Sequence, residues 1–159
     1  MDIVHAATED IPAIQKLLRV TWDDTYGNHL SQMTLDEVYR NWQTVPFLTD
    51  QIQNAEMYFP LVKESTELFG LATARIDGDV IVLFRLYVYP EHQRKGVGEL
   101  LLNNIIEHFK RAKKIQLHAE EFNQKGIPFY KKHGFEEIKR EVGTVGGQEL
   151  NQILMEKIL

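Results

Sequence analysis

The chain lacks cysteine entirely. This absence excludes a disulfide framework, a thiol nucleophile and a cysteine-based metal site, and it fits a reducing compartment. Long hydrophobic runs are also missing, since none approaches the roughly 18 residues that a membrane-spanning helix requires. The N-terminus carries the acids Asp2, Glu9 and Asp10, where a secretory signal would carry bases followed by an apolar segment. The sequence therefore predicts a soluble cytoplasmic protein.

Basic residues are fewer than acidic ones. The chain has 18 basic and 23 acidic residues, a formal net charge of −5, and such a field opposes binding to nucleic acid or to anionic membranes. A cationic partner is favoured by the same charge, although mildly acidic surfaces are common among soluble domains. The six histidines are scattered without the spacing of a metal site. We therefore expect no metal, no nucleic acid and no membrane partner.

The length of 159 residues, 43% of them hydrophobic, suits one well-buried core and is short for two. We expect a single domain over residues 1–159. No surface patch in the sequence indicates an oligomeric state.

The centre of the sequence is a strand, a loop and a helix start. Apolar residues fill the predicted strand Val80–Val88, and Pro90 ends it because proline cannot donate to a β-ladder. Apolar residues then recur at steps of three and four from Val97 to about Ala112, which predicts an amphipathic helix. The free N–H groups at its start and the nearby Gly96 and Gly98 suit a bound phosphate.

Two known phosphate motifs do not match this loop. A P-loop has Lys after its second glycine, whereas here Lys95 precedes Gly96. A dinucleotide fingerprint needs a third glycine where the chain has Leu101. Without a further motif, a plain strand-to-helix turn stays open as an alternative.

Two blocks instead resemble the GNAT family of N-acetyltransferases. The loop Gln93-Arg94-Lys95-Gly96-Val97-Gly98 is similar to the family's acyl-coenzyme A signature, Gln/Arg-x-x-Gly-x-Gly/Ala. About 30 residues later, Asn123 and the segment Ile127–Phe135 resemble the element Asn-x-x-Ala-x-x-Phe-Tyr-x-x-x-Gly-Phe. The chain departs from this pattern by having Gly126 for the alanine and by Pro128, which predicts an irregular first turn in that helix.

The resemblance implies an α/β fold, a mixed and mostly antiparallel seven-stranded sheet flanked by about four helices. It also implies acetyl-coenzyme A as the donor and an enzyme that acetylates a primary amine. Unpaired backbone groups on the splayed strand would bind the pantetheine arm, and Asn123 would cap its helix and contact the donor. The cofactor-binding residues implied are Leu86, Tyr87, Val88, Gln93, Arg94, Lys95, Gly96, Val97, Gly98, Asn123 and Tyr130.

Catalytic roles follow from the same resemblance. Tyr130 matches the family's tyrosine that reaches the thioester sulfur, where a phenol acts as general acid. The backbone N–H of Val88 would stabilise the oxyanion. Some relatives carry a glutamate near the start of the splayed strand, but Val80–Leu83 contains no acid. We name Glu120 as the candidate base, with a solvated strand end as the alternative; His118 is equally suited to a structural role.

The acceptor side is expected between the first two helices. There Trp22, Asp23, Tyr26 and His29 combine aromatic rings, a carboxylate and an imidazole, a set that suits an ammonium group; a plain helix terminus is the alternative. The expected acceptor is a small cationic amine such as a polyamine. Peptide or protein N-termini or lysines, an antibiotic amine, and a non-catalytic acyl-coenzyme A-binding regulator stay open, as does a homodimer, which is frequent among relatives.

Local signals predict the remaining elements. Thr8 would cap a helix beginning at Glu9, and the capping box Thr34–Glu37 would start a second helix ending near Trp42 with Trp42 facing inward. Lys113 and Lys114 would end the helix that begins at Val97. The C-terminal strands, 135–142 and 152–158, would be joined by a glycine-rich loop at 143–150, either a lid or a plain flexible loop.

Overall fold

The computed structural model describes all of residues 1–159. Its strands form one sheet in the order β1-β3-β4-β5-β6-β8-β7, with the short β2 paired to β4. The only parallel neighbours are β5 and β6. The strands are β1 (Asp2–His5), β2 (Met57–Tyr58), β3 (Pro60–Glu64), β4 (Glu67–Asp77), β5 (Val80–Val88), β6 (Lys114–Glu120), β7 (Glu136–Val145) and β8 (Gln148–Ile158).

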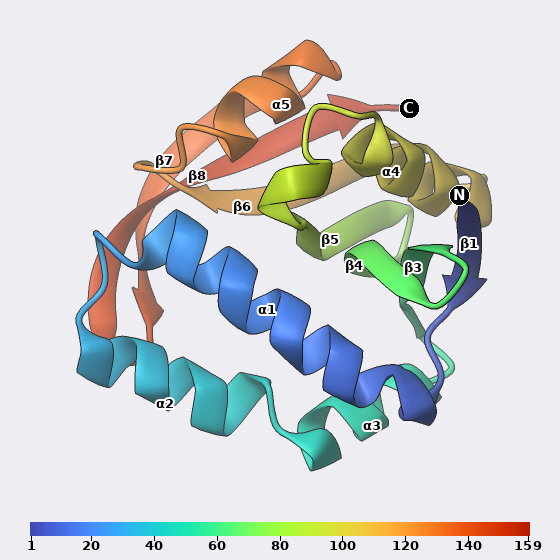
Figure 1. The fold of residues 1–159 in the computed structure, drawn as a ribbon. Coiled ribbons are helices and arrows are strands. Elements are labelled where there is room, and N and C mark those ends of the chain that lie inside the picture. Colours follow the sequence, from blue (N-terminus) through green and yellow to red (C-terminus); the bar gives the residue numbers. More distant parts are fainter.

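Five α-helices and two short 3-10 helices accompany the sheet. In Figure 1, α1, α2 and α3 lie together in the lower half of the view, and α4 and α5 lie in the upper half. The helices are η1 (Thr8–Asp10), α1 (Ile11–Tyr26), α2 (Gln32–Trp42), α3 (Val45–Gln53), η2 (Pro90–His92), α4 (Val97–His108) and α5 (Gly126–Lys132). The predicted α/β class and mostly antiparallel sheet are confirmed, with one short strand and one helix more than expected.

Two of the three hydrophobic clusters attach helices to the sheet. One packs α4 and α5 against the sheet, with Leu101 and Ile105 fully buried. The other packs α1 and α3 against it, with Leu17 and Leu48 fully buried. Burying one such aliphatic side chain stabilises a fold by about 1.5–3 kcal/mol, so both helix layers are firmly attached to the strands that they cover.

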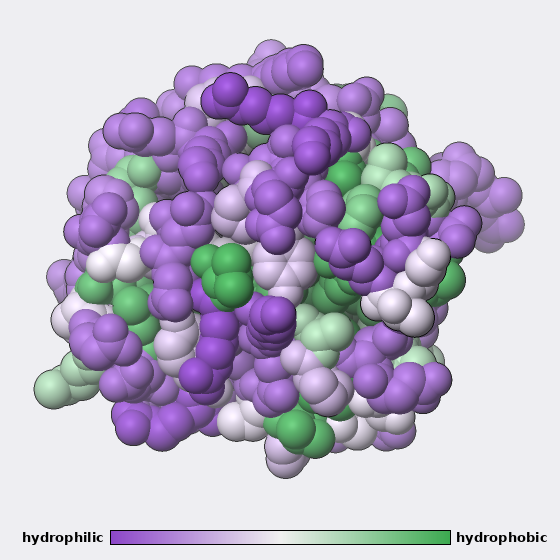
Figure 2. Space-filling model, in the orientation of Figure 1, coloured by the Kyte–Doolittle hydropathy of each residue, from purple (hydrophilic) through white to green (hydrophobic).

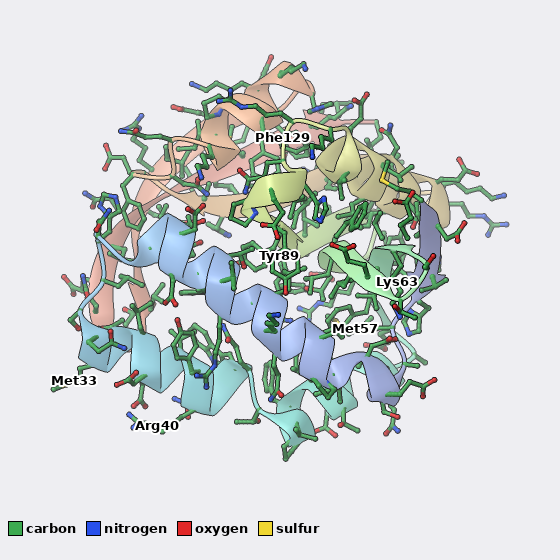
Figure 3. All side chains as sticks on the ribbon, in the orientation of Figure 1. Met33, Arg40, Met57, Lys63, Tyr89 and Phe129 are labelled. Carbon is green, nitrogen blue, oxygen red and sulfur yellow. The ribbon has the colours of Figure 1, made fainter.

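The first two long helices begin differently from the prediction. Thr8 caps no helix; it opens η1, and the backbone N–H of Ala7 donates to Asp10 Oδ2 at 2.8 Å. Asp10 also pairs with Lys63 of β3, which Figure 3 labels. The carboxylate therefore fastens the helix start to the sheet, a tertiary contact that the local sequence does not show.

Helix α2 begins three residues before the predicted start. The hydroxyl of Ser31 accepts a hydrogen bond from the Thr34 N–H at 3.1 Å, so Ser31 is the N-cap and Thr34 lies inside the helix. Glu37, the expected partner in the capping box, accepts instead from Arg40 and Asn41. At the far end Trp42 is 39% exposed, so its predicted inward position is wrong.

Helix α4 ends at His108, before the predicted Ala112. A turn follows, closed by the Ala112 N–H donating to the Phe109 carbonyl, and the Lys113 N–H then donates to the Asp79 carbonyl. Lys113 and Lys114 therefore belong to the return into β6 rather than to the helix terminus.

The predicted loop at 143–150 is a continuation of two strands. Only Gly146 and Gly147 form the turn, with φ values of 53° and 82°, as a tight hairpin turn requires. The Gln148 side chain accepts from Thr34 Oγ1 at 3.1 Å and donates to the His29 carbonyl at 3.2 Å. The hairpin tip is therefore docked on the start of α2.

The face of the molecule in Figure 2 is mostly hydrophilic, with hydrophobic residues in small separate patches. No helix is both long and apolar enough to cross a membrane.

Candidate active site

Strands β5 and β6 pair only at one end. Their parallel register covers Val80–Val82 against Lys114–Gln116, and no pairing follows. The register between β4 and β5 also shifts between Thr73 and Ala74, leaving Phe84 as an extra residue. Such a bulge bends a strand. Beyond the bulge, β5 and β6 separate and leave a slot in the middle of the sheet.

The backbone of β5 presents hydrogen-bonding groups to this slot. The Tyr89 N–H donates to the Phe69 carbonyl of β4 at 3.0 Å, and successive residues of a strand face opposite edges. The backbone of Tyr87 therefore faces β4, whereas the N–H groups of Leu86 and Val88 face the slot. Gln93 Nε2 donates to the Val88 carbonyl at 3.1 Å, which ties the following loop to the strand.

The loop between β5 and α4 forms a cradle of free amides. Arg94 and Gly96 have φ values of 60° and 84°, and no backbone carbonyl accepts from the N–H groups of residues 94–99. The first amide of the helix with a partner is that of Leu100, bonded to the Gly96 carbonyl. These N–H groups and the positive end of the helix dipole suit the pyrophosphate of coenzyme A.

Gly98 brings α5 close to this cradle. A Cβ at Gly98 would lie 3.2 Å from two ring carbons of Phe129 on α5, and Phe129 is labelled in Figure 3. The aromatic ring therefore occupies the space beside the helix start, and it narrows the slot from the α5 side.

Replacing Gly96 by alanine is expected to weaken coenzyme A binding and to destabilise the fold by about 1–2 kcal/mol, because an L-residue is strained at positive φ. Gly78 provides a matched control: its φ is 62°, and a Cβ there would also meet open space. Both variants should lose similar stability in urea unfolding, and only Gly96→Ala should lose coenzyme A affinity in calorimetry. Equal affinity of the two variants would contradict the cradle.

A cavity of about 680 Å³ runs along the slot. Its lining includes nine of the eleven cofactor-binding residues that the sequence indicated: Leu86, Tyr87, Val88, Gln93, Arg94, Gly96, Gly98, Asn123 and Tyr130. Lys95 is exposed and Val97 is buried in the core under α4. The two sequence blocks thus meet across one cavity, although about 30 residues separate them.

Asn123 shapes the α5 side of the cavity. Its Oδ1 accepts from the Gly126 N–H at 2.8 Å, which supports the start of α5 as predicted. A Cβ at Gly126 would lie 2.5 Å from Asn123 Nδ2. With Asn123 in this rotamer, a side chain at position 126 would displace the amide, so glycine leaves the Asn123–Gly126 hydrogen bond undisturbed. The preceding Lys125 pairs with Asp24 of α1 at 2.7 Å, and the pair joins α1 to this loop.

A buried polar cluster occupies the cavity near the C-terminal half of α1. Tyr26 donates its hydroxyl hydrogen bond to Glu120 Oε2 at 3.0 Å, and both side chains are buried. Burial raises the pKa of Glu120. Burial and the nearby Glu120 carboxylate raise the pKa of Tyr87 to about 12. The phenols therefore stay protonated, and Glu120 holds a proton more tightly than an exposed glutamate does.

Tyr130 faces the same cavity from α5. Its ring packs against Phe129 and Phe135 with centroid distances of 5.4 Å each. Burial raises the pKa of its phenol well above the usual value. No protein group forms a hydrogen bond with its hydroxyl, so the hydroxyl is free to meet a bound ligand.

The predicted acceptor residues are only partly brought together. Tyr26 lines the cavity, whereas Trp22, Asp23 and His29 do not. Trp22 is buried in a small core between α1 and α2. Asp23 accepts from the Tyr39 hydroxyl at 2.5 Å, and the His29 ring stacks on Phe122 at 4.0 Å.

The cavity lining also includes residues that the sequence did not indicate as site residues, among them Thr21, Thr25 and Arg85. The two threonines were detectable in principle, because residues four apart share a helix face. Thr21 and Thr25 are four residues apart within α1, so they share one face of the helix, the face that meets the cavity. Arg85 had no such signal, since its position depends on the bulge at Phe84.

No group of three or more His, Asp or Glu side chains that could hold a metal is present. The splayed strands, the amide cradle and the continuous cavity define the donor site of an acyl-coenzyme A acyltransferase. Comparison with known families is specific: the model of the acetyltransferase (GNAT) family matches residues 14–135. The chain therefore belongs to this family and is an acetyl-coenzyme A-dependent N-acetyltransferase.

Individual relatives agree with this assignment. The chain is 25% identical over 141 residues to spermidine N(1)-acetyltransferase of Thermoplasma acidophilum, a match that covers 85% of the chain and 88% of the relative. Among solved structures, PaiA N-acetyltransferase of Thermoplasma acidophilum in complex with coenzyme A superimposes with a TM-score of 0.87 at 24% identity, covering 99% of the chain and 98% of that structure. A GCN5-related N-acetyltransferase of Rhodopseudomonas palustris gives a TM-score of 0.82 at 16% identity, with coverages of 99% and 95%.

Proposed function

We propose that the acceptor is a small cationic amine of the polyamine class. The observation that carries the proposal is the buried Tyr26–Glu120 pair, which places one carboxylate in an aromatic cavity. An ammonium group is attracted there by the carboxylate and by the faces of the surrounding rings. The similarity to a protein named spermidine N(1)-acetyltransferase and the net charge of −5 support the same class.

The residues of the cavity have complementary roles in this proposal. Glu120, with its raised pKa, takes the proton that an ammonium must lose before it can attack, because a base works best with a pKa near the working pH. The Val88 N–H stabilises the oxygen that becomes negative. Tyr130 gives a proton to the departing sulfur, and its buried phenol is protonated at neutral pH.

The proposal is tested by free-thiol release from acetyl-coenzyme A with spermidine, putrescine, an N-terminal alanine peptide, a lysine peptide and an aminoglycoside. Saturable turnover of the polyamines, at a kcat/KM at least tenfold above that of the peptides, is expected. A higher kcat/KM for a peptide would contradict the polyamine proposal and indicate a protein acceptor. Silence with every amine, with acetyl-coenzyme A binding intact by calorimetry, would indicate a non-catalytic regulator.

A further inference from the structure

Arg85 lines the cavity and has no charged partner within the protein. It is the one arginine of the chain that is not exposed, and it lines the cavity on β5, directly after the bulged Phe84. The bulge determines from which face of the sheet the Arg85 side chain projects. The guanidinium reaches the junction of α2 and α3.

Both hydrogen-bond partners of the guanidinium are neutral. One nitrogen donates to Gln51 Oε1 at 2.5 Å, and another donates to the Trp42 carbonyl at 3.2 Å. No Asp or Glu forms an ion pair with it, in contrast to Arg40 and Arg140 on the surface. A guanidinium has five N–H donors, so donors stay available to a ligand.

A charge that is partly withdrawn from water and has no counter-ion is costly, and the Arg85 side chain is half-buried. Burial lowers the pKa of Arg85. The chain is rich in acids, yet none lies against this group. An anion supplied by a ligand would offset the cost, and guanidinium binds a planar carboxylate through two parallel hydrogen bonds.

Tyr87 connects this cation with the catalytic carboxylate. The Glu120 carboxylate raises the pKa of the Tyr87 phenol, and the Arg85 guanidinium lowers it. Both charged groups therefore act on the same phenol, with opposite signs. The cavity therefore has an anionic part at Glu120 and a cationic part at Arg85. A purely cationic acceptor would use only the first part.

We infer that the cavity also acetylates amines that carry a carboxylate, with the amine at Glu120 and the carboxylate bound by Arg85. The inference rests on the proposed position of the amine at Glu120, and it adds amino carboxylates to the polyamines as acceptors. The reaction is otherwise unchanged: the amine nitrogen bonds to the acetyl carbon, the carbon–sulfur bond breaks, and coenzyme A leaves as the thiol.

The test uses two pairs of acceptors that differ by one carboxylate: putrescine with ornithine, and cadaverine with lysine. Wild-type chain should acetylate ornithine or lysine. Arg85→Gln should lower kcat/KM for the amino acids about 10- to 100-fold, because that is the effect of losing a charge-assisted hydrogen bond. For the diamines, kcat/KM should change less than about threefold. Arg85→Lys should restore part of the amino-acid activity, because it restores the charge.

Two control variants separate binding from folding. Arg75→Gln removes an exposed arginine of the neighbouring strand, whose guanidinium lies over Phe84, and should leave both acceptor classes unchanged. Gln51→Ala removes a neutral partner of Arg85 but keeps its charge, so amino-acid turnover should persist. Parallel loss of both classes in Arg85→Gln would assign Arg85 a structural role and overturn the inference.

The outcome is distinguishable from that of the polyamine proposal. Turnover of diamines without any turnover of amino acids overturns the inference and leaves the polyamine proposal standing. Turnover of amino acids alone, lost in Arg85→Gln, supports the inference and replaces the polyamines as the acceptor class.

Discussion

Replacing Tyr130 by phenylalanine is expected to lower kcat about 100-fold while the affinity for coenzyme A stays the same. The substitution removes only the hydroxyl, which forms no hydrogen bond within the protein, and it keeps the ring packed against Phe129 and Phe135. A general acid contributes about 10²- to 10⁴-fold. Steady-state kinetics and calorimetry measure the two quantities.

Stability provides the control for this variant. Because the phenyl ring fills the same space, the Tm of Tyr130→Phe should match that of the wild type. An acetyl donor with a better leaving thiol than coenzyme A should recover much of the lost rate, because a less basic thiolate needs less protonation as it departs. An unchanged kcat, or equal losses of rate and of coenzyme A affinity, would contradict the role of Tyr130 as the acid.

Replacing Glu120 by glutamine is expected to lower kcat/KM about 100-fold or more at neutral pH, because the isosteric amide cannot take a proton from the ammonium. The wild-type kcat/KM should fall as the pH is lowered through the raised pKa of Glu120, which lies above the ordinary glutamate value. This acid limb should disappear in the variant. If the decrease in kcat/KM at low pH persists in Glu120→Gln, another group is the base.

The same substitution should not lower stability. Glu120 has a higher pKa in the folded chain than in the unfolded chain, so its contribution to stability is present at low pH and is lost as the pH rises through the folded value. At neutral pH the wild type therefore bears the cost of a buried carboxylate. The glutamine oxygen can still accept from Tyr26, and Tm at neutral pH should stay equal or rise. The matched control is Glu121→Gln, which changes the exposed residue that follows Glu120 and pairs with Arg140.

The sequence predicts local structure best where the backbone conformation requires a particular residue type. The Gly96 position has positive φ, and the amides around it are free for a phosphate, so the loop could be recognised as an anion site without a structure. Helix starts were less predictable. At the helix starts the local sequence predicts Thr8 and Thr34, whereas Asp10 and Ser31 accept the backbone N–H bonds there. The choice depends on a contact with Lys63 and on the docked hairpin at Gln148.

The residues on the acceptor side were also difficult to predict from the sequence. Trp22 and Asp23 have the residue types expected for an amine site, but α1 turns them toward α2 and Tyr39 instead of the cavity. Tyr26 lies one turn after Trp22 and packs against its ring at 4.2 Å, but it is close enough to β6 to meet Glu120, which is 94 residues away in sequence. Composition alone could not separate these neighbours on one helix.

The sequence by itself determined the family and the order of the elements, because contiguous residues with their own backbone requirements encode them. The role of Tyr130 as the acid stays a prediction. Only the tertiary structure decided which acids and aromatic residues reach the acceptor. The separation of β5 from β6, the bulge at Phe84 and the approach of α1 bring Tyr26, Arg85 and Glu120 around one cavity. Charge and burial there arise from long-range packing, and no local pattern encodes them.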